Sequence, residues 1–163
     1  EISQEGRIPR IDLAERTGIS RATVTTITAD LLRDGLIEEI PREDGVAGTR
    51  GRPRVDLKIA GAAHLVAGVK VSGSRISLVL MDFEGSQLAD HEVPLGAGRH
   101  SPAALAGHIC DAVAELAAKI GIDTAQISGV GVGLAGTIDA GAGAVHWSPS
   151  PNARNVDFAA LLA

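Results

Sequence analysis

The sequence has few of the residues that cross-link or anchor a chain. Cys110 is the single cysteine among 163 residues, so no disulfide and no thiolate zinc site can form within one chain. This cysteine usage is typical of a reducing cytosol. Cys110 falls in an apolar helical pattern, which predicts a buried structural thiol. No apolar run reaches the roughly 18 residues that span a bilayer, and the N-terminus does not have the form of a signal peptide.

Patterns for catalysis are also missing. The sequence has no Ser/His/Asp arrangement and no convincing pair of carboxylates for acid–base chemistry. Its five histidines do not have the spacing of metal ligands; they are His64, His91, His100, His108 and His146. We therefore predict no catalytic residue, no metal site and no cofactor.

The charge distribution separates two parts of the chain. The formal net charge is −5, which does not fit a protein that binds DNA through electrostatics alone. Residues 1–58 carry ten Lys/Arg and eleven Asp/Glu, whereas residues 59–163 carry five and nine. An almost neutral, locally basic N-terminal part beside an acidic remainder fits a DNA-binding head joined to a body that does not bind DNA.

A helix-turn-helix is predicted near the N-terminus, after a first helix within residues 1–9. The pattern indicates a second helix over Ile11–Thr17 and a turn at Gly18, because glycine adopts the left-handed conformation easily. Ser20 is a good N-cap for a third helix, which should stop at Gly35. Such a unit typically places its last helix in the DNA major groove.

Apolar spacing orients this third helix. Val24, Ile27 and Leu31 recur at helical spacing and should face the core, with Ile19 filling the corner between the helices. The remaining faces carry the residues that we predict to contact DNA: Ser20, Arg21, Ala22, Thr23, Thr25 and Thr26. Threonine hydroxyl and methyl groups suit base edges. The start of the helix, with Arg21, is placed to reach a phosphate or a guanine.

A wing follows the third helix. Strands are predicted over residues 36–40 and 55–59, with a turn rich in Gly, Pro and charge between them. Arg50 and Arg52 in this turn are predicted to contact a phosphate or the minor groove. Two alternatives remain, namely a solvated charged turn and a winged domain used only for protein contacts. Together these elements predict a winged helix-turn-helix domain over residues 1–60.

Residues 61–163 have the pattern of an α/β domain. Three strands separated by Gly-containing turns predict an antiparallel meander over residues 65–71, 75–81 and 87–93. A helix with proline at its first position should run from Pro102 to about Ile120, followed by a buried strand over 127–134. A short strand over 145–147 and a final helix capped by Asp157 complete the predicted order.

Alternating glycines mark the predicted buried strand, in the run Gly129–Gly136. The run lacks the Lys-Ser/Thr ending of a phosphate-binding loop, so we expect its glycines to let a helix pack closely on a central strand. Gly136 lies at the strand end, where ligands of α/β sheets bind. Trp147 and Asn152 then offer ring stacking and a bidentate amide to a sugar, with a packing or turn role as the alternative for each.

Three segments together resemble the transcriptional-regulator branch of the ROK family (repressors, open reading frames and kinases). They are Ile19–Val24, Gly51–Pro53 and Gly129–Asp139. The resemblance implies an actin-like, ribonuclease-H-like ATPase-type half-domain behind the winged head, a homodimer or tetramer, and control by a sugar or sugar phosphate. It also implies that Gly136 and Asn152 lie in segments that border the sugar. We expect the chain to stop after the first part of this domain, before the remaining sugar, zinc and catalytic-type segments.

The resemblance also bears on the use of ATP. Kinase members of the family carry an aspartate and a Gly-Gly-Thr turn on the first strand pair, and the matching run here is Gly68–Ser74. Lys70 stands in place of the acid, and Ser72 stands in place of a glycine. An ammonium group cannot hold Mg²⁺, and Ser72 narrows the phosphate turn. We therefore predict that the protein is not an enzyme.

These observations predict a sequence-specific DNA-binding regulator in the bacterial cytosol, associated with the nucleoid and without a membrane partner. Its partners would be double-stranded operator DNA and a small sugar or sugar phosphate, and its role would be that of a repressor of carbohydrate genes. Two alternatives remain open. One is a sugar kinase with a fused DNA-binding head, and the other is a ligand-independent DNA-binding dimer.

Overall fold

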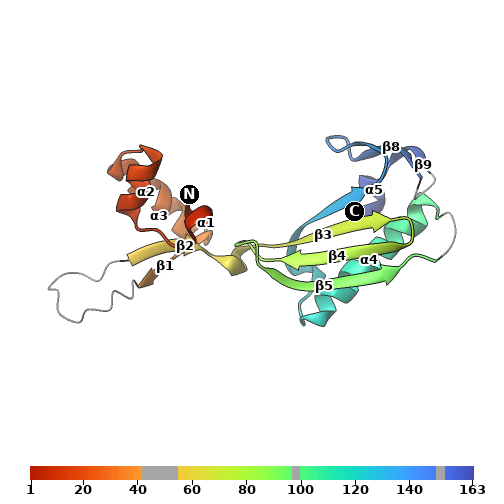
Figure 1. The fold of residues 1–163 in the computed structure, drawn as a ribbon, viewed down its shortest axis with the longest axis horizontal. Helices are drawn as coiled ribbons and strands as arrows, with labels where there is room; N and C mark the ends of the chain where they lie inside the picture. The colour runs from red at the N-terminus through yellow and green to blue at the C-terminus, as the bar shows by residue number, and fades with distance from the viewer. Residues whose placement is uncertain (42–54, 97–99, 150–152) are drawn as a thin grey trace. The chain divides into compact units, whose positions relative to one another are not determined.

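The computed structural model describes residues 1–41, 55–96, 100–149 and 153–163 (Figure 1). Contacts divide the chain into two units, Glu1–Ala63 and His64–Ala163, each with its own hydrophobic core. We call these units the head and the body. The boundary between them falls at Ala63, close to the predicted division after residue 60.

The head has the element order of a winged helix-turn-helix (Figure 1). Its helices are α1 (Ile2–Glu5), α2 (Arg10–Thr17) and α3 (Arg21–Arg33). Its strands, β1 (Ile37–Pro41) and β2 (Val55–Ile59), form an antiparallel pair in which Ile37 lies opposite Ile59. The three predicted helices and both strands are confirmed, and the turn between the strands lies outside the described residues.

Apolar side chains from the helices and both strands of the head meet in one core. The buried members are Ile8, Leu13, Ala14, Val24, Ile37 and Leu57. Leu57 on β2 is fully buried, and its backbone exchanges two hydrogen bonds with Ile8, at 3.0 and 2.9 Å. These two hydrogen bonds hold the segment between α1 and α2 against β2.

The predicted inner face of α3 is wrong at one position. Ile27 is 44% exposed, whereas Thr28 is only 1% exposed and takes its place in the interior. The burial of a polar side chain is tolerated here because both hydrogen-bonding roles of the hydroxyl are used. Thr28 Oγ1 donates to Thr25 O at 3.2 Å and accepts a hydrogen bond from Arg10 Nε at 3.0 Å. A partner 18 residues away thus allows Thr28 to face inward.

The body is built on a mixed four-stranded sheet in the order β5-β4-β3-β6. The predicted antiparallel meander is confirmed as β3 (Leu65–Ser72), β4 (Arg75–Met81) and β5 (Gln87–Pro94). Strand β6 (Ile127–Leu134) pairs parallel with β3, and the connection to it contains α4 (Pro102–Lys119). The N-cap of α4 is Ser101, whose side chain accepts a hydrogen bond from Ala104 N at 3.2 Å.

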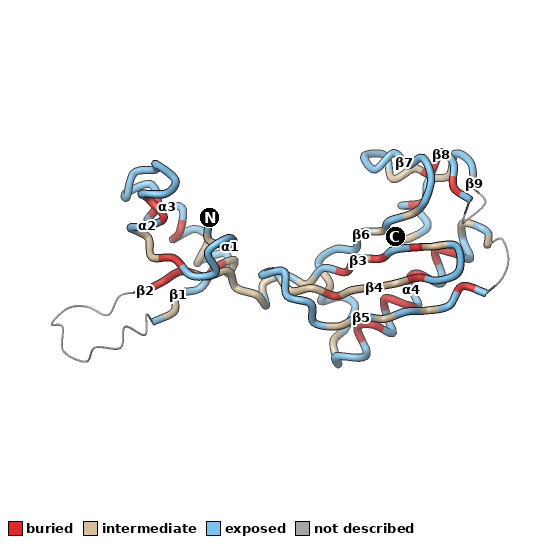
Figure 2. The backbone as a smooth tube through the Cα atoms, viewed as in Figure 1, coloured by how far each residue is buried: buried red, intermediate tan, exposed pale blue. Residues whose placement is uncertain are grey.

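One face of the sheet and α4 enclose the core of the body (Figure 2). Alternate residues of β3 and β4 point to this face, as the period of a strand requires; the buried ones are Ala67, Val69, Val71, Ile76, Leu78 and Leu80. Helix α4 supplies a matching apolar stripe that includes Leu105, Ile109 and Leu116. In the part of the chain that the structure describes, no helix is both long and apolar enough to cross a bilayer.

Three predictions about the body are wrong. Strand β6 lies at one edge of the sheet and is largely exposed, because α4 packs against β4 and β5. Cys110 on α4 is exposed rather than buried. Among the described residues, no helix packs closely on Gly129 or Gly131, since a Cβ built at either position meets no atom within 4 Å. The apolar sequence of β6 therefore does not correspond to a buried position in the sheet.

A second sheet follows β6. It consists of β7 (Thr137–Asp139), β8 (Ala144–Ser148) and β9 (Ala153–Asp157), antiparallel in that order, and leads into α5 (Ala159–Leu162). The predicted strand over residues 145–147 lies within β8, whereas β7 and β9 were not predicted. Asp157 Oδ1 accepts a hydrogen bond from Ala160 N at 3.0 Å, as predicted for a residue that caps this helix, although the N-cap position of α5 is Phe158.

Gly136 makes the turn from β6 into β7. Its φ is 139°, and a Cβ at this position would lie 2.1 Å from the carbonyl oxygen of Trp147. Neither this backbone conformation nor this space suits a residue with a side chain. The fold itself therefore requires glycine here, independently of any ligand.

We expect Gly136→Ala to lower the free energy of unfolding of the body by at least about 2 kcal/mol, through backbone strain and a steric clash. Trp147 is the only tryptophan in the sequence, so its fluorescence during urea unfolding reports on the body. Gly131→Ala is the matched control, because a Cβ there is in open space, and it should change stability by less than about 1 kcal/mol. Equal losses in the two variants would contradict this structural role of Gly136.

Candidate nucleic-acid interface

Helix α3 begins with a complete N-cap. Gly18 ends α2 in the left-handed conformation, with φ 69° and ψ 10°, as predicted. Ser20 Oγ then accepts a hydrogen bond from Thr23 N at 3.2 Å and lies 2.8 Å from Thr23 Oγ1. The cap fixes where α3 starts, and it leaves the positive end of the helix exposed and accessible to an anion.

All the residues of α3 and its cap that were predicted to contact DNA are exposed, and we call them the outer face: Ser20, Arg21, Ala22, Thr23, Thr25 and Thr26. The inward side of the same helix is marked by buried Val24 and Thr28. Ala29 is exposed as well and continues the outer face by a further turn. The structure therefore brings the predicted residues together on one accessible surface.

Two threonines of the outer face direct their hydroxyl groups back to their own helix. Thr25 Oγ1 donates to Arg21 O at 2.8 Å, and Thr26 Oγ1 donates to Ala22 O at 3.2 Å. Hydrogen bonds to the carbonyl four residues earlier restrict the χ1 angle of a threonine in a helix. The orientation of both methyl groups is therefore set before any ligand arrives.

The two arginines of α3 differ in their partners. Arg33 Nη1 lies 2.9 Å from Asp30 Oδ1, and its Nε lies 3.5 Å from Asp34 Oδ1. The Arg21 side chain is 72% exposed, and its Nη2 lies 3.7 Å from Glu15 Oε1. Exposed ion pairs of this kind contribute little. Arg21 can consequently turn to a phosphate, whereas Arg33 is shared between two carboxylates.

Sequence reasoning missed the contact that fixes α3 relative to the wing strands. Arg10, the first residue of α2, donates from Nε to Thr28 Oγ1 at 3.0 Å and from Nη2 to Glu39 Oε1 at 2.6 Å. One side chain therefore links α2, α3 and β1. No local pattern singles out this arginine, because both of its partners are distant in the sequence.

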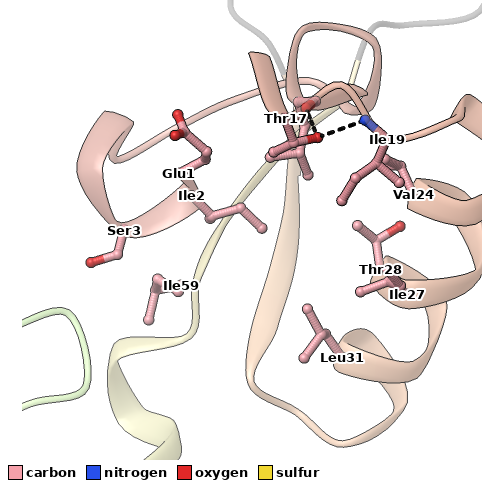
Figure 3. Close-up of a pocket in the computed structure, with 11 residues that line it drawn as sticks. Glu1, Ile2, Ser3, Thr17, Ile19, Val24, Ile27, Thr28, Leu31 and Ile59 are labelled. Carbon is pink, nitrogen blue, oxygen red and sulfur yellow. Dashed lines mark hydrogen bonds between the residues drawn. The ribbon is translucent and has the colours of Figure 1, made fainter. Parts of the chain in front are cut away.

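An apolar hollow of about 380 Å³ opens beside α3 (Figure 3). Ile19, Ile27 and Leu31 line it from the helix-turn-helix, and Ile2 and Ile59 line it from α1 and β2. Ile19, predicted to fill the corner between the helices, remains 39% exposed at this hollow. An apolar lining does not suit a phosphate, so the polar contacts expected of a DNA interface belong to the outer face.

The other predicted site residues belong to the wing and to the body. Arg50, Arg52 and Asn152 lie outside the described residues. Gly136 is exposed at the tight turn between β6 and β7. Among the residues that the structure describes, no three His, Cys, Asp or Glu side chains lie close enough together to hold a metal ion.

Lys70 and Ser72 occupy the strand and turn where the kinase pattern has an acid and a glycine. Lys70 is exposed on β3, in register with Ser77 on β4 and Gly133 on β6. Ser72 Oγ donates to Arg75 O at 3.1 Å across the turn. The hydroxyl of Ser72 therefore closes the turn, and the nearest charged group on β3 is an ammonium rather than a carboxylate.

Family models match both units. A model for winged helix-turn-helix DNA-binding domains matches residues 1–38, and a model for the ROK family matches residues 66–163. The second match covers more than half of the chain. The N-acetylglucosamine repressor of Escherichia coli O157:H7 is 27% identical over 154 residues, which are 94% of this chain and 37% of that protein. The chain thus spans little more than a third of the length of this relative.

Two solved structures are similar in fold, one over almost the whole chain and the other over 60% of it. A crystal structure of a ROK family transcriptional regulator, a homologue of the E. coli MLC protein, matches 99% of this chain and 40% of its own, with a TM-score of 0.73 at 21% identity. A ROK family glucokinase from Streptomyces griseus, in complex with glucose and AMPPNP, matches 60% of this chain and 29% of its own, with a TM-score of 0.50 at 26% identity. The predicted fold class, a winged head with an actin-like half-domain, is confirmed. The chain belongs to the ROK family.

Proposed function

We propose that the protein is a sequence-specific DNA-binding regulator that represses genes of carbohydrate metabolism. The outer face of α3 is the observation that carries this proposal. It is exposed, its helix is capped by Ser20, and it lies on the helix that winged helix-turn-helix domains insert into the major groove. The match to DNA-binding winged domains and the similarity to the N-acetylglucosamine repressor support the same function.

Phosphate contacts position the head on DNA in this proposal. Ser20 and the first turn of α3 present amide groups and the positive helix end to a backbone phosphate, and Arg21 adds an exposed guanidinium. Arg50 and Arg52 extend the contact from the wing to a further phosphate or the minor groove. A homodimer or tetramer sets two such heads into major grooves about one helical turn apart.

A sugar or sugar phosphate is the proposed effector. It binds the body at the turn that contains Gly136, with Asn152 as a further contact, and changes the separation of the two heads. The name of the E. coli relative, a repressor for N-acetylglucosamine, supports a sugar of this class. The similarity of the body to a glucose-binding kinase also supports a sugar site in this half of the fold.

Similarity to a glucokinase raises sugar phosphorylation as a second candidate function. Two observations weigh against it. Lys70 places an ammonium where a carboxylate would be needed to hold Mg²⁺, and the Ser72 hydroxyl is already bound to Arg75 O. We therefore propose a regulator without kinase activity, in which the body binds a sugar but does not phosphorylate it.

Arg21→Ala should weaken binding to all duplexes and reduce the dependence of log K on log[salt] by about one unit, because one phosphate contact is lost. Arg75→Ala, at an exposed arginine of β4 in the body, is the control and should leave the slope unchanged. Fluorescence anisotropy with a labelled duplex at several salt concentrations measures both. A change in base preference without a change in slope would assign Arg21 to a guanine instead.

Binding of a sugar to the body should raise the thermal stability of the protein, because a ligand that binds only the folded state stabilises it. We expect at least one compound in a panel of hexoses, amino sugars and their phosphates to raise the melting temperature and to alter operator binding in a gel-shift assay. A panel without any shift would favour the ligand-independent dimer.

A coupled assay of ADP release, with ATP and the same sugar panel, should show no turnover above the blank. Lys70 removes the carboxylate that a metal–nucleotide complex would need. Release of ADP with any hexose would instead favour the kinase. Lys70→Asp is an informative companion variant, because it restores the acid without disturbing the core at this exposed position.

A further inference from the structure

The centre of α3 lacks the side chains that usually read bases by paired hydrogen bonds. Residues 22–29 include no charged residue and no amide. In the major groove, arginine or lysine recognises guanine, and asparagine or glutamine recognises adenine. None of these occurs between Arg21 and Asp30, so the middle turns of α3 have to discriminate bases by another kind of contact.

Thr26 lies at the middle of the exposed side of this segment. Ala22 and Ala29 are its neighbours four residues before and three residues after, and all three are exposed. The single proton of the Thr26 hydroxyl is donated to Ala22 O at 3.2 Å. Thr26 therefore presents a methyl group and oxygen lone pairs outward, but no donor. With the Cβ atoms of its two alanine neighbours, this methyl group forms a short apolar surface.

We infer that Thr26 recognises the 5-methyl group of a thymine in the major groove. Thymine is the base that presents a methyl group there, and the small side chains of Ala22 and Ala29 let the helix come close to the groove floor. Independent evidence that this helix meets DNA is the match of residues 1–38 to DNA-binding winged domains. The inference rests on the proposed function, because it requires α3 to enter a major groove.

Ile27 is less suited to this role, although it is also exposed. It borders the apolar hollow together with Ile19 and Leu31 (Figure 3), and helical spacing places it about 100° around α3 from Thr26. Thr25 makes the same back-bond as Thr26, to Arg21 O, but it lies towards the flank that leads to buried Thr28. Ala22 and Ala29 are neighbours of both threonines, but Thr26 is the one that lies opposite both buried positions of the helix, Val24 and Thr28.

The test begins with a duplex selected by the protein from a randomised pool. Each thymine of this duplex is then replaced singly by deoxyuridine, which removes only the 5-methyl group. At one or more positions the protein should bind about fourfold more weakly, the change expected for one methyl-sized group that is no longer buried. This measurement needs no protein variant, so it does not depend on how a substitution affects folding.

Two variants of Thr26 then assign the contact. Thr26→Ser keeps the hydroxyl and removes the methyl group, so it should bind the thymine and uracil duplexes equally. Thr26→Val keeps the methyl shape and removes the hydroxyl, so it should still prefer thymine. Thr124→Ser, at an exposed threonine between α4 and β6 in the body, is the control and should behave like the unchanged protein.

The outcomes separate the inference from the proposed function. If the protein selects a duplex but tolerates uracil at every position, the thymine contact is refuted while the proposed function stands. If Thr26→Ser still prefers thymine over uracil, the methyl group of Thr26 does not make the contact and the inference is wrong. If no sequence is enriched from the pool, both the inference and the proposed function fail.

Discussion

The hydrogen bonds of Arg10 determine which side of the recognition helix is available to DNA. Its guanidinium satisfies the buried hydroxyl of Thr28 and reaches Glu39 on β1. Because Thr28 is satisfied in this way, α3 can bury a polar residue and turn Ile27 outward. The rotation of α3 about its own axis, and with it the position of Thr26 at the centre of the outer face, follows from this contact.

Local patterns predicted most helices and strands of the chain, but they missed β7 and β9 and did not predict which residues are buried. The Ser20 cap, the left-handed Gly18 and the antiparallel meander depend on residues close in sequence, and all were predicted correctly. The errors concern residues whose surroundings come from distant segments. Thr28 needs Arg10 as a partner, and Cys110 is exposed although its neighbours on α4 are apolar. Whether these residues are buried depends on the segments that pack against them, and not on the residue type alone.

In the candidate site, too, some features could be predicted from the sequence and others could not. Its residues could be found from the sequence because a helix-turn-helix orders them along one helix. The direction of the Thr25 and Thr26 hydroxyls could not be found, because threonine in a helix can either bond to its own backbone or point to a partner. This choice changes the chemistry of the face from donors to methyl groups and acceptors. It therefore alters which base the head is expected to prefer, without changing a single residue in the site.

The inferred recognition by methyl groups also fits the charge of the chain. A formal net charge of −5 weakens long-range attraction to DNA, and contacts between methyl groups act only at short range. Several such contacts have to form together, which in a dimer requires both heads to be at the correct separation. In the proposed regulator, a small change in that separation is then enough to release the operator. A strongly basic head would remain bound through phosphates and would respond less to the same movement.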